Sequence, residues 1–221
     1  KYLTNKVHLI KENPVKDLDS PKLKKTLPKY LTLEESVQLL SSVDGQNRER
    51  DYCILTLFLN CGLRISELCA LNTTDIQDDA LRVLGKGNKV RIVYLNDACK
   101  EALNGYLAVR RPIVGRDQNA LFLSSRNERV SRSTVHALVK KHLGEAGLDS
   151  TQYSAHKLRH TAATLMLQNG VDVKAVQEVL GHEHLNTTEI YTHIDNEALR
   201  VAAKANPLSR VKPPKKNEAG K

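Results

Sequence analysis

The spacing of apolar residues changes once along this chain, and that change constrains the fold more than any other feature. Through most of the sequence, apolar side chains recur with the spacing of amphipathic helices. Between residues 81 and 94 they alternate instead, on either side of the turn sequence Gly85-Lys86-Gly87-Asn88. This alternation predicts a β-hairpin. We therefore expect a mainly α fold with one small antiparallel β-sheet, an α+β domain.

Capping residues mark several of the expected helix ends. Thr32 begins a helix, and Glu35 three residues later completes a capping box. Gly62 is placed to end the next helix, because glycine readily adopts the left-handed conformation of a helix C-cap. After the helix from Thr32, the expected helices cover roughly residues 48–60, 65–71, 97–109, 131–146, 155–168, 173–180, 187–193 and 196–205, and residues 120–123 are expected to add a third strand.

The two ends of the chain differ in composition from its middle. Residues 1–29 are polar, rich in lysine and interrupted by three prolines, which predicts a linker. Residues 207–221 are basic and contain proline, which predicts a flexible tail. Residues 30–206 are expected to form one domain that includes the last helix. Because the first residue is Lys1 and not Met, we expect the chain to be a fragment or a processed product.

The charge and the cysteines narrow the class of protein. Lys and Arg number 34 against 25 Asp and Glu, a formal charge of +9 with neutral His, so a polyanionic partner such as nucleic acid is expected. None of the four cysteines forms a C-x-x-C pair, which argues against a zinc site. Three lie in apolar helical stretches, as buried free thiols do, and this fits a reducing, cytoplasmic compartment. No apolar run approaches the ~18 residues of a membrane span, so no membrane partner is expected.

Basic and proton-sharing side chains lie at the edges of the expected elements. Arg64 follows a helix end, and Lys86 lies at the hairpin turn. His156, Arg159 and His160 stand at positions i, i+3 and i+4 of one helix, so they are expected to share a face. The full candidate set is Arg64, Glu67, Lys86, His156, Arg159, His160, His182 and Tyr191.

This set is suited to a phosphodiester. Guanidinium groups present planar pairs of N–H donors that match phosphate oxygens. Metal-assisted phosphoryl transfer needs clustered carboxylates to hold Mg²⁺, and the sequence around these residues has no such cluster. We therefore expect neither metal nor cofactor: the cations would stabilise the transition state themselves, and a side-chain nucleophile, of which a tyrosine hydroxyl is one option, would attack phosphorus. Each residue alone also has an ordinary structural interpretation, so the hypothesis depends on their joint order.

Four blocks of sequence in a fixed order resemble the tyrosine recombinase family, also called the phage integrase family. The resemblance covers most of residues 30–205, and the blocks are most similar to those of the compact Xer-type bacterial members. The blocks are CGLRISEL at residues 61–68, GKGNK at 85–89, HKLRHT at 156–161, and Leu180-Gly181-His182 followed by TTEIYTH at 187–193.

The resemblance implies a role for each residue. Tyr191 would attack the scissile phosphate and form a 3′-phosphotyrosyl link, without metal or ATP. Arg64 and Arg159 would hold the non-bridging oxygens and stabilise the pentacoordinate state. His182 would donate to a phosphate oxygen, and His156 would act as a general base or hydrogen-bond donor.

Three further roles follow from the same resemblance. Lys86 would be the general acid for the 5′-hydroxyl leaving group, and Lys89 is its competitor for that role. Glu67 would orient the catalytic cations without transferring protons. His160 belongs to its block but is expected to be structural.

Family members work as tetramers on paired sites, so the resemblance implies double-stranded DNA as partner and a homo- or hetero-tetramer of recombinase subunits. It also implies exchange of the helix at about 196–205 between subunits, with intramolecular packing of that helix as the alternative. Family members usually carry an N-terminal DNA-clamping domain; we expect this sequence to begin near the end of it, with residues 1–12 as the end of its last helix.

Several functions stay open at this point. Recombination would serve either chromosome dimer resolution or the integration and excision of a mobile element. The rivals are strand relaxation of the type IB topoisomerase kind, and a non-catalytic DNA-binding protein on the same scaffold.

Overall fold

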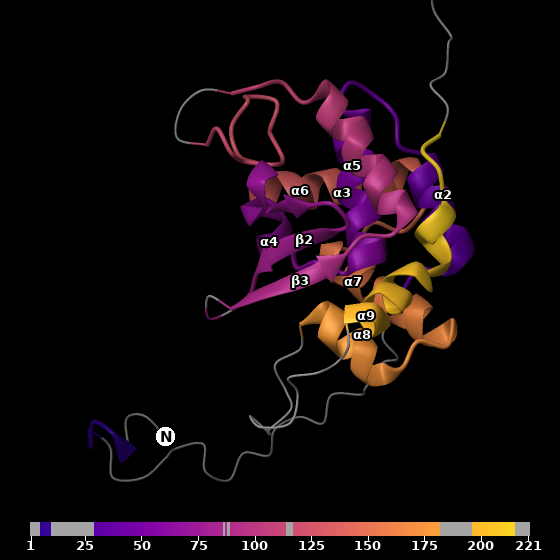
Figure 1. The fold of residues 1–221 in the computed structure, drawn as a ribbon. Helices are drawn as coiled ribbons and strands as arrows, with labels where there is room; N and C mark the ends of the chain where they lie inside the picture. Colours follow the sequence, from indigo (N-terminus) through magenta and orange to yellow (C-terminus); the bar gives the residue numbers. More distant parts are fainter. Residues whose placement is uncertain are drawn as a thin grey trace, which may run out of the picture.

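The computed structural model describes residues 5–9, 29–85, 87, 89–113, 117–181 and 196–214. Helices pack around a central helix, and a small sheet lies along one side of them (Figure 1). The helices are α2 (Leu33–Ser41), α3 (Arg48–Cys61), α4 (Ile65–Ala70), α5 (Asp97–Val109), α6 (Arg132–Glu145), α7 (Ala155–Gln168), α8 (Val173–Leu180) and α9 (Asn196–Lys204). The strands are β1 (Ile76–Gln77), β2 (Ala80–Leu84) and β3 (Val90–Tyr94), and η1 (Thr73–Asp75) and η3 (Pro207–Arg210) are short 3-10 helices. This confirms the expected fold class.

Helix α3 forms the centre of the hydrophobic core. Every residue from Asp51 to Cys61 is buried, and the helix packs chiefly against α5 and α7. A helix that is buried on all sides must be surrounded by other elements, and this arrangement fixes where its two ends lie. Gly62 ends it in the left-handed conformation, with φ of 58°, as the sequence predicted.

Most of the other expected helix ends are also confirmed. At the start of α2, the Glu35 backbone N–H donates to Thr32 Oγ1 at 3.1 Å, and the Thr32 N–H donates to Glu35 Oε2 at 2.8 Å. Helices α7 and α8 begin and end at the expected residues. The helix expected at 187–193 lies outside the described residues. Cys53, Cys61 and Cys99 are buried free thiols, which confirms their expected packing role.

The sheet has the order β1-β2-β3, and both pairings are antiparallel. Its third strand is therefore β1, and the prediction that residues 120–123 supply it was wrong. That segment forms only isolated bridges, Asn72 with Ala120 and Leu123 with Arg129. Its four side chains are buried, so its sequence resembles a buried strand although no neighbouring strand pairs with it.

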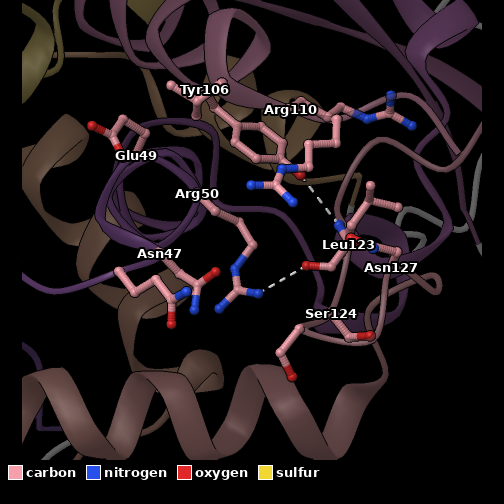
Figure 2. Close-up of a pocket in the computed structure, with 12 residues that line it drawn as sticks. Asn47, Glu49, Arg50, Tyr106, Arg110, Leu123, Ser124 and Asn127 are labelled. Carbon is pink, nitrogen blue, oxygen red and sulfur yellow. Dashed lines mark hydrogen bonds between the residues drawn. The ribbon is translucent and has the colours of Figure 1, made fainter.

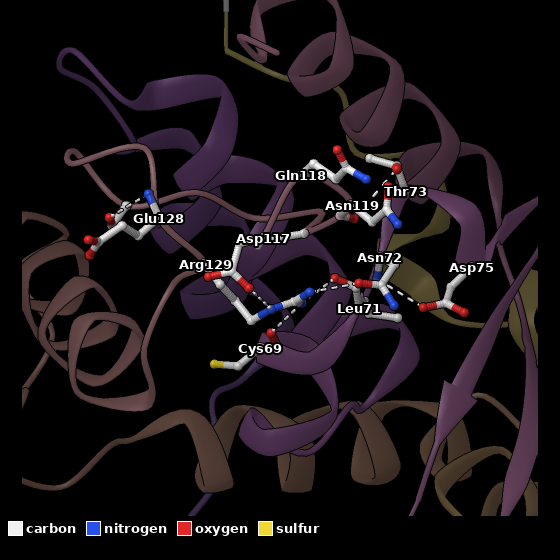
Figure 3. A network of polar contacts seen from close by, with 12 residues as sticks. Cys69, Leu71, Asn72, Thr73, Asp75, Asp117, Gln118, Asn119, Glu128 and Arg129 are labelled. Carbon is white, nitrogen blue, oxygen red and sulfur yellow. Dashed lines mark hydrogen bonds and ion pairs between the residues drawn. The ribbon is translucent and has the colours of Figure 1, made fainter. Parts of the chain in front are cut away.

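The side chain of Arg129 attaches this segment to the end of α4, as Figure 3 shows. Its guanidinium donates to the Leu71 carbonyl at 2.9 Å, to the Cys69 carbonyl at 3.2 Å and to Asn72 Oδ1 at 2.7 Å. Carbonyls at a helix C-terminus lack partners within the helix. Arg129 satisfies them here, and it thereby stabilises the helix whose N-cap is Arg64.

The return strand of the hairpin, β3, buries the opposite set of side chains from the set that its apolar alternation suggested. Val90 is 53% exposed and Ile92 is 37% exposed, whereas Val93 is buried. The register pairs Arg91 with Val83, which is fully buried. Arg91 therefore lies on the inward face, where strand alternation would ordinarily place an apolar residue.

Helix α9 packs within its own chain. Leu199 and Ala202 join Met166, Val176, Val179 and Leu180 in a second apolar cluster beside the main core. Arg200 forms an ion pair with Asp79, and its Cζ lies 4.6 Å from the centroid of the Tyr94 ring. The single chain thus shows the intramolecular packing that was the alternative to exchange.

The segment that follows α9 is attached to the core at its start. Leu208 is fully buried, and Asn206 Nδ2 donates to the Leu59 carbonyl at 3.0 Å. The flexible tail expected from Pro207 therefore does not begin there, because an apolar anchor holds η3 against α3. Residues 215–221 lie outside the described residues. Within the described part of the chain, the helices are too short or too polar to span a bilayer.

Candidate active site

Arg64 stands where the chain leaves the core helix. It is the N-cap of α4, two residues beyond Gly62, and its side chain is 35% exposed. Its Nη2 donates to the Gly181 carbonyl at 2.8 Å, and its Nη1 donates to Glu67 Oε1 at 2.7 Å. The guanidinium therefore connects the end of α3 with the end of α8.

Arg159 approaches the same point from α7 and is 6% exposed. Its Nη1 donates to the Gly62 carbonyl, and its Nη2 donates to the Leu180 carbonyl at 2.7 Å. Burial, and secondarily the charge of Arg64, lower the pKa of Arg159 to about 10. It remains a cation at neutral pH.

The two arginines meet at the C-terminus of α8, although they come from distant parts of the sequence. They hold the consecutive carbonyls of Leu180 and Gly181, which carry the partial negative charge of a helix C-terminus. The chain that follows Gly181 therefore starts beside a pair of guanidiniums. His182 is its first residue, and Tyr191 lies further along the same segment.

Gly62 makes this junction possible. A Cβ on Gly62 would lie 2.3 Å from Leu180 Cδ2, and the residue has a positive φ of 58°. A left-handed conformation costs a non-glycine residue about 1–2 kcal/mol, and overpacking adds about 1–3 kcal/mol. We expect Gly62→Ala to lower the free energy of unfolding by roughly 2–4 kcal/mol, as measured by urea denaturation.

Gly105→Ala is the matched control for this prediction. Gly105 lies within α5 and has open space where a Cβ would stand, so alanine is expected to raise stability by about 0.5–1 kcal/mol. Equal unfolding midpoints for the two variants would contradict the proposed close approach at Gly62.

Glu67 lies between charged partners and is 3% exposed. Its Oε2 accepts the Arg64 backbone N–H at 2.7 Å, and both of its oxygens accept from Arg91, at 2.6 and 3.0 Å. Burial raises the pKa of Glu67, but the hydrogen bond and charge of Arg91, together with the hydrogen bonds of Arg64, outweigh it and hold the pKa below its usual value. An ionised carboxylate with every oxygen engaged orients cations and has no proton to transfer.

The two histidines of α7 have different surroundings, so the three residues expected on one face do not form one cluster. His156 is exposed, one turn before Arg159. The His160 ring makes an edge-to-face contact with Tyr30, with centroids 6.2 Å apart. Burial, with Lys157 and His156 nearby, lowers the pKa of His160. A packed, neutral His160 agrees with the structural role expected for it.

Three predicted residues, Lys86, His182 and Tyr191, lie outside the described residues. The hairpin that carries Lys86 is nevertheless placed next to Glu67, because a Cβ on Gly85 would lie 3.9 Å from Glu67 Oε1. The Gly85 N–H donates to the Lys89 carbonyl at 2.8 Å and closes the turn. Lys89 itself is exposed.

Arg91 is the residue of this site that the sequence motifs did not include. A signal for it was present: β2 turns Leu81 and Val83 inward, and hairpin register then places Arg91 and Val93 on the same face. The apolar alternation of Val90 and Ile92 obscured that signal.

A second group of arginines lines a pocket of about 420 Å³ between the start of α3, the end of α5 and residues 123–127 (Figure 2). Arg50 Nη1 donates there to the Leu123 carbonyl at 2.8 Å, and Arg110 Nε donates to the Leu121 carbonyl at 3.0 Å. None of the predicted site residues lines this pocket. Its arginines hold loop carbonyls, so the candidate site is the junction of Arg64, Arg159, Glu67 and Gly181.

The chain matches a known family over most of its length. Residues 29–198 match the family described as Phage integrase family. The chain belongs to the phage integrase family. This confirms the resemblance that the four sequence blocks indicated.

Those relatives are Xer proteins. The chain is 56% identical over 210 residues to the tyrosine recombinase XerC of Caldanaerobacter subterraneus subsp. tengcongensis, covering 95% of this chain and 60% of that protein. It is 39% identical to XerC of Thermodesulfovibrio yellowstonii, covering 91% of this chain and 70% of that protein. The chain therefore spans 60% of the first relative's length and 70% of the second's.

Solved recombinases share the fold. The XerA recombinase aligns with a TM-score of 0.65 and 34% identity, covering 80% of this chain and 64% of that one. The XerH site-specific recombinase, in a pre-cleavage complex with its difH substrate, aligns with a TM-score of 0.64 and 30% identity, covering 82% of this chain and 56% of that one. The fold is that of a tyrosine recombinase catalytic domain.

Proposed function

We propose that this chain is the catalytic part of a site-specific recombinase that cuts and rejoins DNA through a 3′-phosphotyrosyl intermediate at Tyr191. One observation carries the proposal: Arg64 and Arg159 hold the carbonyls of Leu180 and Gly181. The segment that contains His182 and Tyr191 therefore begins at two guanidiniums that retain further N–H donors for a phosphate.

The proposed reaction exchanges one phosphate ester for another. The Tyr191 phenol oxygen bonds to phosphorus while the bond from phosphorus to the 5′ oxygen breaks. The leaving 5′ oxygen takes a proton from Lys86, or from its competitor Lys89. The phenol proton passes to His156 where His156 acts as general base, or to water where His156 acts as hydrogen-bond donor. Attack by a new 5′-hydroxyl reverses these steps, so the strand reseals without ATP.

The electrostatics of the site support this chemistry. The transition state carries more negative charge on the non-bridging oxygens than the bound phosphodiester does. Arg64 and Arg159 are fixed before DNA binds, by backbone carbonyls and by Glu67, so little reorganisation is needed when that charge develops. His182 would add a third donor to a phosphate oxygen.

We further propose that double-stranded DNA is bound by a tetramer of like or related subunits, and that the reaction resolves chromosome dimers in the cytoplasm. The Xer names of the relatives and the difH complex of XerH support DNA as the partner. Exchange of α9 would reuse the surface that Leu199 and Ala202 occupy on α8 in the single chain. Residues 1–29 would lead from an N-terminal DNA-clamping domain.

A suicide substrate tests the proposal. The full-length protein is incubated with its recombination site, nicked next to the cleavage position so that the released fragment diffuses away. We expect a covalent protein–DNA band, and mass spectrometry of the digested band should place the phosphate on the peptide containing residues 187–193. Supercoil relaxation without recombinant product would favour the topoisomerase alternative, and failure to form the band would favour a DNA-binding protein without catalysis.

A further inference from the structure

Arg91 contacts both oxygens of Glu67 with its side chain. It lies on the inward face of β3, and its side chain is 16% exposed. Its Nη1 donates to Glu67 Oε1 at 2.6 Å, and its Nη2 donates to Glu67 Oε2 at 3.0 Å. This two-point geometry, between a planar guanidinium and a carboxylate, is the strongest form of side-chain ion pair.

The carboxylate of Glu67 is shared between two arginines. Oε1 accepts from the side chains of Arg91 and Arg64, and Oε2 accepts from the Arg91 side chain and the Arg64 backbone. Arg159 lies near enough for the Glu67 charge to influence its pKa, so these four residues bring together three guanidiniums and one carboxylate. Two positive charges therefore remain at the site. Without Arg91, Arg64 alone would balance the Glu67 charge, and only one positive charge would remain.

Arg91 also touches the other anchor of Arg64. A Cβ on Gly181 would lie 3.0–3.2 Å from Cδ, Nε and Cζ of Arg91, so the arginine side chain lies against the glycine. The carbonyl of the same glycine accepts from Arg64 Nη2. Arg91 thus contacts both groups, Glu67 and Gly181, that hold the Arg64 guanidinium.

We infer that Arg91 is a positioning residue for Arg64. Arg91 pairs with Glu67 at two points and packs against Gly181, and these contacts hold the Arg64 guanidinium in place. They also leave the site with a net positive charge that can bind the phosphate. This role rests on the proposed function, in which Arg64 binds the non-bridging oxygens. Both terminal nitrogens of Arg91 donate to Glu67, so in this proposal Arg91 acts on the phosphate through Arg64.

The test compares Arg91→Gln and Arg91→Lys with a matched control, Arg82→Gln. Arg82 lies on the neighbouring strand β2 and pairs with Asp75 at 3.1 Å, and its side chain is 55% exposed. The readouts are the rate of covalent complex formation at saturating suicide substrate and, separately, the affinity for DNA. Rates are expressed per folded molecule, from the fraction that circular dichroism reports as native.

We expect Arg91→Gln to lower the saturated cleavage rate roughly 10- to 100-fold, with a much smaller change in affinity. Arg91→Lys should recover part of the rate, because it keeps the charge but makes one contact in place of two. Arg82→Gln should stay within about two-fold of the unsubstituted protein, since an exposed pair is worth little.

Two further readouts separate positioning from a merely structural role. Burial alone raises the pKa of Glu67 and Arg91 lowers it, so the acidic limb of the rate profile should move to higher pH in Arg91→Gln. The double variant Arg91→Gln/Glu67→Gln should lose less rate than the product of the two single-variant losses, because without the carboxylate Arg91 keeps only its contact with Gly181. Losses that multiply in the double variant, or an unchanged saturated rate in Arg91→Gln, would overturn the inference.

The inference can be decided even if the proposed function fails. Should the unsubstituted protein form no covalent complex, carbon-13 NMR of the labelled Glu67 carboxyl and titration with inorganic phosphate replace the rate measurements. We then expect Arg91→Gln to raise the Glu67 pKa and weaken phosphate binding, and Arg82→Gln to change neither. An unaltered Glu67 titration in Arg91→Gln would refute the role of Arg91.

Discussion

Tyr191→Phe is expected to abolish the covalent protein–DNA complex while DNA binding stays within about two-fold of the unsubstituted protein. Phenylalanine keeps the ring and lacks only the oxygen that forms the phosphate ester, so no slower version of the same reaction remains. The measurement is the suicide-substrate assay, with an electrophoretic mobility shift to show that the variant still binds DNA.

Three of the other tyrosines that the structure describes are poor substitutes for this nucleophile. Tyr52 and Tyr106 are buried; burial raises the pKa of Tyr52 to about 12 and also raises the pKa of Tyr106. A phenol in such surroundings resists ionisation and cannot reach a phosphate. Tyr94 lies under the Arg200 guanidinium.

Tyr153→Phe is the control for this prediction. Tyr153 is half-buried against the main core, so its substitution removes a phenol oxygen from the same protein without altering the proposed site. We expect the normal yield of covalent complex. A covalent complex that persists in Tyr191→Phe would assign the nucleophile to another residue.

Arg159→Lys is expected to slow cleavage at saturating substrate about 100- to 1,000-fold, the usual effect of removing one preorganised donor to transition-state charge. Lysine keeps the positive charge, but its single ammonium cannot donate to the Gly62 and Leu180 carbonyls and to a phosphate in the same geometry. The rate of covalent complex formation and the DNA dissociation constant, measured separately, should show the loss mainly in the rate.

The same substitution also destabilises the fold, and the experiment must separate the two effects. A carbonyl that loses its buried donor costs about 1–3 kcal/mol. Arg110→Lys is a matched control: Arg110 Nε donates to the Leu121 carbonyl at 3.0 Å, and its Nη2 donates to the Ala120 carbonyl at 2.6 Å, away from the site. It should lose comparable stability and retain the cleavage rate. Equal rate losses in the two variants would show that Arg159 acts through stability alone.

The pH dependence follows from the same residues. Because the pKa of Arg159 is lowered only to about 10, this arginine is fully protonated between pH 6 and 8. Changes of rate in that range must therefore come from other groups. Glu67, whose pKa is below its usual value, also stays ionised there.

The sequence by itself determined the features that depend on near neighbours along the chain. The capping box of Thr32 and Glu35, the stop at Gly62 and the bounds of α7 and α8 each follow from hydrogen bonds or conformations within about one helical turn. The candidate site residues could be chosen because the order of four short motifs is a property of the sequence. The fold class followed from the period of the apolar residues.

Only the tertiary structure decided which groups surround those residues. Two arginines hold the Leu180 and Gly181 carbonyls, and Arg91 pairs with Glu67; these contacts join segments far apart in sequence. Such contacts depend on how helices and strands pack, and packing is a property of the whole core. A local pattern shows that a side chain is charged or apolar, and the packed neighbours decide what that side chain meets.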